Sequence, residues 1–186
     1  MKEYTADELL EAREKRVVLI DKLLKRYNTP LLVIRVNYPG LKKTNNITVK
    51  IIENMGSLIC TVLSDRVCGK LLLQGAEGPI LYVAVKQEVL DLKRFAIDFE
   101  EKHPFGRCLD LDVYDLEGKS ISRQELGYPR RKCYLCEDYA HYCVRARRHS
   151  EQEVVIYIER KFREYINLKS RIFYTYKEKP CKYGKK

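Results

Sequence analysis

The sequence lacks several features that would define a class of protein at once. No run of 18 or more apolar residues occurs, so the sequence predicts no membrane-spanning helix. The N-terminus carries mixed charges (Lys2, Glu3, Asp7 and Glu8) where a secretory signal would have an apolar core. Internal repeats and low-complexity linkers are also missing. We therefore expect a cytoplasmic protein with a single domain.

The composition allows a packed core and favours an anionic partner. The chain has 186 residues, 45% of them hydrophobic, so we predict one catalytic domain over residues 1–170 and a basic tail over 171–186. Seven cysteines, an odd number without a secretory signal, indicate reduced thiols. The net charge of +10 attracts nucleic acids, phosphorylated small molecules or acidic proteins. With 14 tyrosines, a nucleic-acid-binding (RNA) module without catalysis is the alternative.

Helical and alternating patterns succeed each other without a fixed repeat. A capping box formed by Thr5 and Glu8 opens a helix that we predict to continue to about residue 27. Further helices are predicted from 44–46 onward and over 86–102, 135–148 and 151–168; strands are predicted over 31–36, 71–73, 80–85 and 109–113. This mixture predicts an α+β (mixed α/β) fold, with a short central sheet flanked by helices.

The clearest chemical feature is a pair of carboxylates on one predicted strand. Asp110 and Asp112 alternate with Leu109, Leu111 and Val113, so both carboxylates project from the same face. Two carboxylates placed in this way can converge on one divalent cation or bridge two, and they suit Mg²⁺, which prefers oxygen ligands and leaves positions for substrate phosphates. The other interpretation is the solvated face of an edge strand. We favour a metal-binding and catalytic role for both residues, because phosphate-binding residues surround them.

Basic residues before and after the pair could bind phosphates. Gly106 would allow close approach of the backbone, and Arg107 can donate two hydrogen bonds to one phosphate. The other predicted phosphate-binding residues are Arg130, Arg131, Arg145, Arg147 and Arg148. If residues 135–148 are helical, Arg145 and Arg148 share a face with His141. For any single arginine, a solvated surface position is an equally good interpretation, but so dense a set favours an anionic ligand.

The cysteines around residue 136 raise the alternative of a zinc site. Cys133 and Cys136 are followed by His141 and Cys143, which are residue types that bind zinc. If residues 136–143 form a helix, however, Cys136 and Cys143 lie roughly 10.5 Å apart along its axis. Such a spacing would prevent them from sharing one ion and would make them ordinary core residues. Zinc is therefore possible in this segment but not favoured, and a redox role is favoured less.

Three segments resemble the citrate lyase holo-acyl-carrier-protein synthases, also called apo-citrate lyase phosphoribosyl-dephospho-coenzyme A transferases. The segments are His-Pro-Phe-Gly-Arg-Cys-Leu-Asp-Leu-Asp-Val at 103–113, Pro-Arg-Arg-Lys-Cys-Tyr-Leu-Cys-Glu at 129–137 and Ala-His-Tyr-Cys-Val-Arg-Ala-Arg-Arg-His at 140–149. The first predicted helix and the Asn-Tyr-Pro-Gly motif at 37–40 are also similar to this family. The likeness spans most of residues 7–170.

The resemblance implies a reaction and its partners. In this family, a serine of the acyl carrier protein (the gamma subunit of citrate lyase) attacks triphosphoribosyl-dephospho-CoA and releases diphosphate. The carrier thereby gains its 2'-(5-phosphoribosyl)-3'-dephospho-CoA prosthetic group. Such nucleotidyl transfer fits a carboxylate-bound Mg²⁺ among arginines, and by analogy it implies a nucleotidyltransferase-like core. A nucleic acid is then not the favoured partner, because Asp110 and Asp112 would repel its backbone.

Overall fold

The protein folds around a four-stranded antiparallel sheet, which confirms the predicted mixed α/β class. The computed structural model describes residues 3–177, with side chains as far as residue 169. The strand order is β2-β3-β1-β4. The strands are β1 (Leu31–Val36), β2 (Val67–Gly75), β3 (Gly78–Val85) and β4 (Leu109–Tyr114), and the helices are α1 (Ala6–Tyr27), α2 (Asn46–Leu63), α3 (Val89–Lys102), α4 (Ala140–Arg145) and α5 (Glu151–Lys177).

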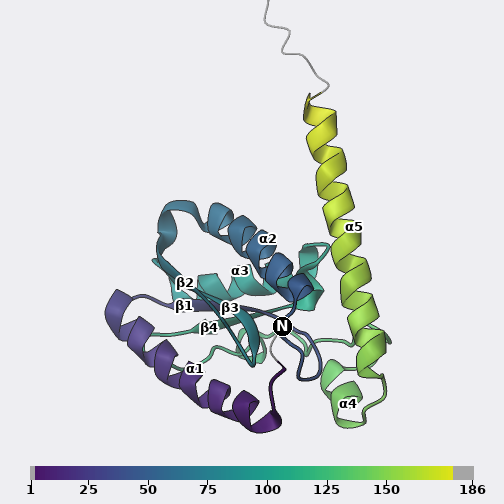
Figure 1. Cartoon of the computed structure of the whole chain (residues 1–186). Helices are drawn as coiled ribbons and strands as arrows, with labels where there is room; N and C mark the ends of the chain where they lie inside the picture. Colours follow the sequence, from purple (N-terminus) through teal and green to yellow (C-terminus); the bar gives the residue numbers. More distant parts are fainter. Residues whose placement is uncertain (1–2, 178–186) are drawn as a thin grey trace, which may run out of the picture.

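Helices cover both faces of the sheet. Figure 1 shows α1 on one side and α2 and α3 on the other, with α5 beside the sheet and projecting beyond it. Beneath α2, α3 and α5 lies the larger core, which includes Leu32, Ile34, Ile51 and Phe105. The smaller core lies beneath α1, where Ile20, Leu23 and Leu24 pack on alternate residues of β1 and β3. Because neighbouring residues of a strand face opposite sides, each strand serves both cores.

The predicted starts of α1 and α2 agree with the structure. Thr5 and Glu8 form both hydrogen bonds of the capping box, and Asn45 caps α2. By length and hydropathy alone, Asn46–Arg66 could cross a membrane. The side chains of Ile51, Met55 and Ile59 in this segment are buried against the sheet. The apolar character of α2 is thus accounted for by its packing in the core.

Several predicted boundaries differ from the structure. The strands predicted over 71–73 and 80–85 are the longer hairpin of β2 and β3, and α3 begins at Val89 instead of residue 86. The helix predicted over 135–148 is wrong in extent, because only Ala140–Arg145 is helical and a short hairpin precedes it. Helix α5 continues past the predicted end at 168 as far as Lys177. The predicted boundary at residue 170 falls within α5, and the tail beyond 177 lies outside the described residues.

The open edge of β4 is closed by two buried charged residues of α3. Oε1 of Glu100 accepts a hydrogen bond from the backbone N–H of Leu111 at 2.9 Å, and Nζ of Lys93 donates to the Leu111 carbonyl at 3.3 Å. Glu100 is 4% exposed and Lys93 7%. These side chains replace a neighbouring strand at Leu111, so they block pairing at that edge and hold β4 in place. β4 is the strand that carries the predicted site.

Candidate active site and metal centre

Asp110 and Asp112 project from the same face of β4, as predicted. Leu109, Leu111 and Val113 are buried on the opposite face, whereas the two aspartates are partly exposed. One guanidinium nitrogen, Nη2 of Arg35, donates to an Oδ2 atom of each carboxylate, both at 2.7 Å. The two carboxylates therefore converge on a single cationic group. About a third of the Asp110 side chain (35%) and 28% of that of Asp112 remain exposed to solvent.

Arg35, Asp110 and Asp112 form what we call the Arg35 cluster. Arg35 is its central residue but was not identified from the sequence. It lies opposite Asp110 in the β1–β4 pairing. Burial opposes the charged form of Arg35, but Asp110 and Asp112 outweigh this effect and raise its pKa. The available signal was a lone charge in the buried strand 31–36, since such a charge requires a partner of opposite sign. Its partner could not be identified without the strand register.

A third carboxylate, also missed in the sequence, lies near Arg35. Glu77 in the β2–β3 turn forms an ion pair with Arg16 of α1 at 2.9 Å, and its Oε1 lies 3.9 Å from Nη1 of Arg35. Its second oxygen, Oε2, is buried and has no hydrogen-bond partner among the described residues, and the same is true of Nε of Arg35. Such buried polar atoms are uncommon and can be satisfied by a bound polar ligand or water. The cluster thus contains acceptor and donor capacity that the protein itself leaves unused.

Arg131 is the predicted arginine that reaches the aspartates. It contacts Asp110 at 3.3 Å, donates to the Leu109 carbonyl at 3.2 Å and forms an ion pair with the buried Glu100. Burial disfavours its charge, but Glu100 and then Asp110 raise its pKa. Arg131 therefore connects the edge of β4 with the carboxylate pair and orients Asp110.

The other predicted phosphate-binding arginines contact other residues or are exposed. Arg107 donates to the carbonyl of Lys132, Arg130 contacts His141 at 3.1 Å and Arg148 contacts Asp138 at 2.8 Å. Arg145 and Arg147 are exposed. The predicted helical face shared by His141, Arg145 and Arg148 is wrong for Arg148, because α4 ends at Arg145.

Gly106 occupies a packed position against the backbone of α3. A Cβ atom at this residue would lie 2.1 Å from the Phe99 carbonyl oxygen and 2.8 Å from that of Glu100. Its own N–H donates to the His103 carbonyl at 2.8 Å. The close approach of Gly106 is thus to the C-terminal turn of α3, and this contact explains the need for glycine.

We expect Gly106→Ala to lower stability by about 2 kcal/mol, because the new methyl group meets backbone atoms that cannot rotate away. Urea unfolding monitored by circular dichroism measures this loss. The matched control is Gly75→Ala in the β-hairpin, where a Cβ atom would meet nothing within 4 Å. A Gly106→Ala protein as stable as the control would contradict the packing role.

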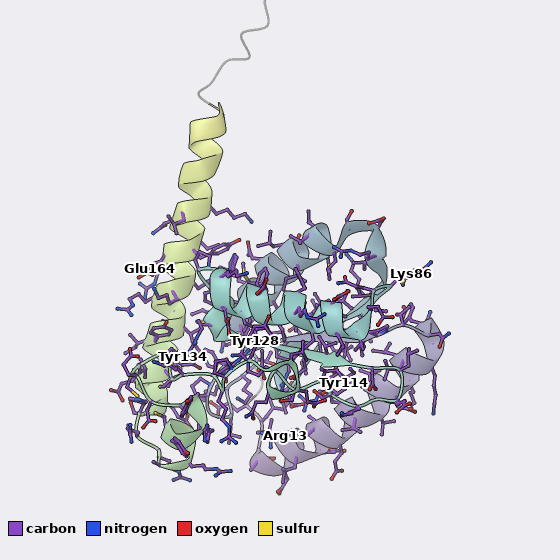
Figure 2. The ribbon with its side chains drawn as sticks, turned by 180° about the vertical axis from the view of Figure 1, so that it is seen from behind. Arg13, Lys86, Tyr114, Tyr128, Tyr134 and Glu164 are labelled. Carbon is purple, nitrogen blue, oxygen red and sulfur yellow. The ribbon has the colours of Figure 1, made fainter. Side chains whose placement is uncertain are left out.

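A cavity of about 640 Å³ opens where β1 ends. Its wall includes residues of the Asn37–Gly40 motif, together with Lys43, Tyr134 and Arg147. Tyr134 donates to the Asn37 carbonyl at 3.2 Å and stacks on Tyr157 of α5, and Figure 2 shows it beside that helix. Burial lowers the pKa of Lys43, and the positive charges of Arg13 and Arg35 act in the same direction. The cavity thus combines aromatic surface with positive charge close to the Arg35 cluster.

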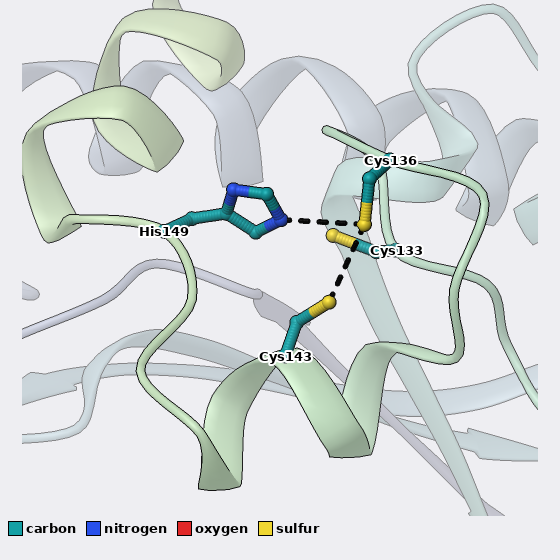
Figure 3. Close-up of side chains that lie close together, drawn as sticks. All are labelled: Cys133, Cys136, Cys143 and His149. Carbon is teal, nitrogen blue, oxygen red and sulfur yellow. Dashed lines mark hydrogen bonds between the residues drawn. The ribbon is translucent and has the colours of Figure 1, made fainter.

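A second cluster consists of Cys133, Cys136, Cys143 and His149, whose ligand atoms all lie within 4.8 Å of one another. The sulfurs of Cys136 and Cys143 are 3.4 Å apart, and Nε2 of His149 lies 3.4 Å from the Cys136 sulfur. Figure 3 shows the four side chains converging. The predicted separation of about 10.5 Å is wrong, because Cys136 precedes α4 and lies in the hairpin loop.

The backbone of the hairpin loop favours an ionised thiol at Cys136. A hydrogen bond from the Asp138 backbone, supported by His149 and Cys143, lowers the pKa of Cys136 to about 6. Burial raises the pKa of Cys143 to about 12. His141, which the sequence groups with the cysteines, instead contacts Arg130 and packs on Tyr142. His149 takes the place that was expected for His141.

The turn after α4 explains why His149 reaches the cysteines. The N–H of Arg148 donates to the Cys143 carbonyl at 3.0 Å and that of Arg147 to the Val144 carbonyl at 3.3 Å, which together form a Schellman motif. Arg147 has φ 47°, a left-handed conformation that usually belongs to glycine at this position. Because arginine occupies the position where glycine is usual, the sequence does not predict this turn.

Comparison with known proteins assigns the chain first to a class of enzyme. Residues 4–165 match a family described as apo-citrate lyase phosphoribosyl-dephospho-CoA transferase, so the protein is a transferase. A protein from Vibrio cholerae serotype O1, named probable apo-citrate lyase phosphoribosyl-dephospho-CoA transferase, is 36% identical over 86% of this chain and 92% of its own length. The transferase of Citrobacter koseri is 33% identical over 82% of this chain and 85% of its own. A probable transferase of Streptococcus pyogenes serotype M3 is 34% identical over 86% of each chain.

The chain belongs to the apo-citrate lyase phosphoribosyl-dephospho-CoA transferase family. The resemblance found in the sequence is therefore confirmed. The alternative, a nucleic-acid-binding module without catalysis, receives no support from these comparisons. The family match includes β4, the Arg35 cluster and the four-residue Cys/His cluster.

Proposed function

We propose that the protein transfers the 2'-(5-phosphoribosyl)-3'-dephospho-CoA group to a serine of the citrate lyase acyl carrier protein, the gamma subunit, in the cytoplasm. The donor is triphosphoribosyl-dephospho-CoA. The serine oxygen forms a bond to the α-phosphorus, the bond from that phosphorus to the bridging oxygen breaks, and diphosphate leaves. The serine proton is released in the same reaction. Family membership supports the reaction, and the geometry around Asp110 and Asp112 supports its site.

The observation that carries this proposal is the convergence of two partly exposed carboxylates on one cation. Oxygen ligands on one strand face suit Mg²⁺, so Asp110 and Asp112 would hold this ion. When bound, Mg²⁺ neutralises charge on the triphosphate and its leaving group. Ion pairs with Arg35 orient both carboxylates, and Arg131 contacts Asp110 as well. By analogy, this arrangement corresponds to a nucleotidyltransferase-like core.

The other arginines and the cavity would bind the remaining parts of the donor. The predicted phosphate-binding residues Arg107, Arg130, Arg145 and Arg148 give this region a positive surface that attracts both the donor and an acidic carrier. Arg147 and Lys43 line the cavity next to tyrosine side chains. Tyrosine rings can stack on a base, and the cations can bind phosphates. We therefore place part of the donor in this cavity.

Mass spectrometry of the apo carrier, incubated with the protein, Mg²⁺ and triphosphoribosyl-dephospho-CoA, tests the function directly. We expect the carrier mass to increase by that of the prosthetic group and the transfer to require both the donor and Mg²⁺. Omitting Mg²⁺ is a better control than adding a chelator, because a chelator would also remove a thiolate-bound metal. An unmodified carrier, together with salt-sensitive binding of RNA, would reverse the proposal in favour of the alternative.

Among the predicted arginines, Arg147 provides the sharpest test of donor binding. We expect Arg147→Ala to weaken donor binding about tenfold, because the side chain lines the cavity and can form charge-assisted hydrogen bonds to phosphate. Arg145→Ala removes the same charge from the same segment, outside the cavity lining, and should weaken binding less. Calorimetric titration with the donor, and separately with the carrier, measures both effects. Equal losses for the two variants would exclude the cavity as the donor site.

A further inference from the structure

We propose that Cys133, Cys136, Cys143 and His149 bind one structural Zn²⁺ ion, which fastens the segment carrying Arg147 to the start of α5. The four residues come from three places in the chain. Cys133 and Cys136 lie on the hairpin loop, Cys143 lies on α4, and His149 lies just before α5. A single ion would therefore connect all three elements.

The distances fit a tetrahedral centre. Ligands at 2.0–2.3 Å from zinc lie roughly 3.5–3.8 Å from one another in a tetrahedron. The Cys136 sulfur lies 3.4 Å from the Cys143 sulfur and 3.4 Å from Nε2 of His149, and no pair of the four ligand atoms is farther apart than 4.8 Å. Three sulfurs and one imidazole nitrogen select a soft or borderline ion, and four protein ligands close the site against substrate.

Backbone hydrogen bonds in the hairpin hold Cys133 and Cys136 in position to act as ligands. Lys132 and Tyr139 form an antiparallel bridge, and the N–H of Cys133 donates to the Asp138 carbonyl at 2.6 Å. Inside this loop, the N–H of Leu135 donates to the Cys133 sulfur at 3.4 Å. A hydrogen bond of this kind stabilises a sulfur that carries negative charge, as a metal-bound thiolate does.

This segment has almost no apolar core of its own. Between residues 129 and 150, Cys143 is the only buried residue, whereas Tyr139, Tyr142 and Val144 are 41%, 49% and 76% exposed. Helix α4 has six residues, which is too short to be stable in isolation. Small lobes of this kind commonly depend on a metal or a disulfide. A disulfide would use two of the sulfurs and leave the third sulfur and His149 without a role.

The proposed metal site forms part of the cavity wall and would therefore affect the position of Arg147. Cys133, Cys143 and His149 lie in the cavity wall, and Arg147 lies between the last two of these ligands in the chain. The metal would hold the Schellman turn that points Arg147 toward the cavity. The zinc proposal can nevertheless be tested independently of the proposed reaction, because zinc binding and the local order of this segment can be measured without a transfer assay.

Elemental analysis by inductively coupled plasma mass spectrometry tests the site. We expect about one zinc per chain in protein purified without a metal-affinity tag or added metal. Cys136→Ser and His149→Asn should lose most of it, whereas Cys68→Ser and His141→Asn should keep it, since Cys68 is exposed on β2 and His141 lies outside the cluster. Retention by His149→Asn with loss by His141→Asn would overturn this ligand set.

Two measurements on the wild-type protein avoid reliance on variants that fail to fold. Removal of zinc should speed trypsin cleavage within residues 130–148 at least tenfold without unfolding the sheet, and zinc should restore protection. Replacement by Co²⁺ should give the absorption of a tetrahedral thiolate complex. Metal-free protein whose cleavage does not respond to zinc would overturn the proposal, and so would a Cys136–Cys143 disulfide found by mass spectrometry.

Discussion

Asp110→Asn and Asp112→Asn should each reduce transfer to the carrier serine by at least about 100-fold while leaving the fold intact. An asparagine keeps the shape of the side chain and can still accept a hydrogen bond from Arg35, but it loses the negative charge that attracts Mg²⁺. The Arg35 side chain is 22% exposed and keeps the other carboxylate as a partner in each variant, so neither variant leaves a fully buried charge unpaired. The initial rate of carrier modification, measured by mass spectrometry at saturating donor, reports the effect.

Asp98→Asn is the matched control for this experiment. Asp98 lies on α3 and forms an exposed ion pair with Lys102 at 2.9 Å, so the same chemical change occurs away from the cluster. We expect its transfer rate to equal that of the unaltered protein. Thermal unfolding should give similar midpoints for all three variants. A nearly normal transfer rate for Asp110→Asn or Asp112→Asn would contradict the proposed metal site.

The dependence on Mg²⁺ separates loss of metal binding from loss of catalysis after binding. If each aspartate ligates the ion, the variants should require a higher Mg²⁺ concentration for half-maximal transfer, and part of the activity should return at high concentrations. If the carboxylates act only by holding Arg35, added Mg²⁺ should have no such effect. This second result would show that Asp110 and Asp112 act by positioning Arg35 and do not bind the metal.

The common face of Asp110 and Asp112 could be predicted from the sequence because it depends only on the two-residue period of a strand. The buried residues Leu109, Leu111 and Val113 fix which face turns inward. Arg35 and Glu77 could not be assigned in the same way. Their positions depend on the pairing of β1 with β4 and on how α1 covers the sheet, and both are long-range properties.

The cysteine cluster shows how a small local error changes a functional interpretation. Extending α4 backwards over Cys136 placed it on the same helix as Cys143 and separated the two sulfurs. The structure replaces that part of the predicted helix with the Lys132–Tyr139 hairpin, which brings them together. Helix boundaries are difficult to predict from one sequence when no proline or glycine marks them. Here, the Schellman turn also has arginine at the position where glycine is usual.

Glu100→Ala should lower the free energy of unfolding by about 3 kcal/mol, which is the largest stability loss that we expect from a single substitution outside the apolar core. The carboxylate has only 5% of its side chain exposed. It accepts from the Leu111 N–H and forms ion pairs with Arg123 and Arg131. Alanine would leave that N–H without its acceptor and both guanidinium groups with less negative charge.

Glu101→Ala is a close control, because Glu101 is adjacent and also contacts Arg123, at 3.1 Å. Its side chain is 38% exposed, so its loss should cost less than about 1 kcal/mol. Glu100→Gln should fall between the two, since its amide oxygen can still accept from Leu111. Urea unfolding of the three variants gives the free energies, and similar losses for Glu100→Ala and Glu101→Ala would contradict the role assigned to Glu100. Because Arg131 connects Glu100 with Asp110, Glu100→Gln should also slow transfer while most of the protein remains folded.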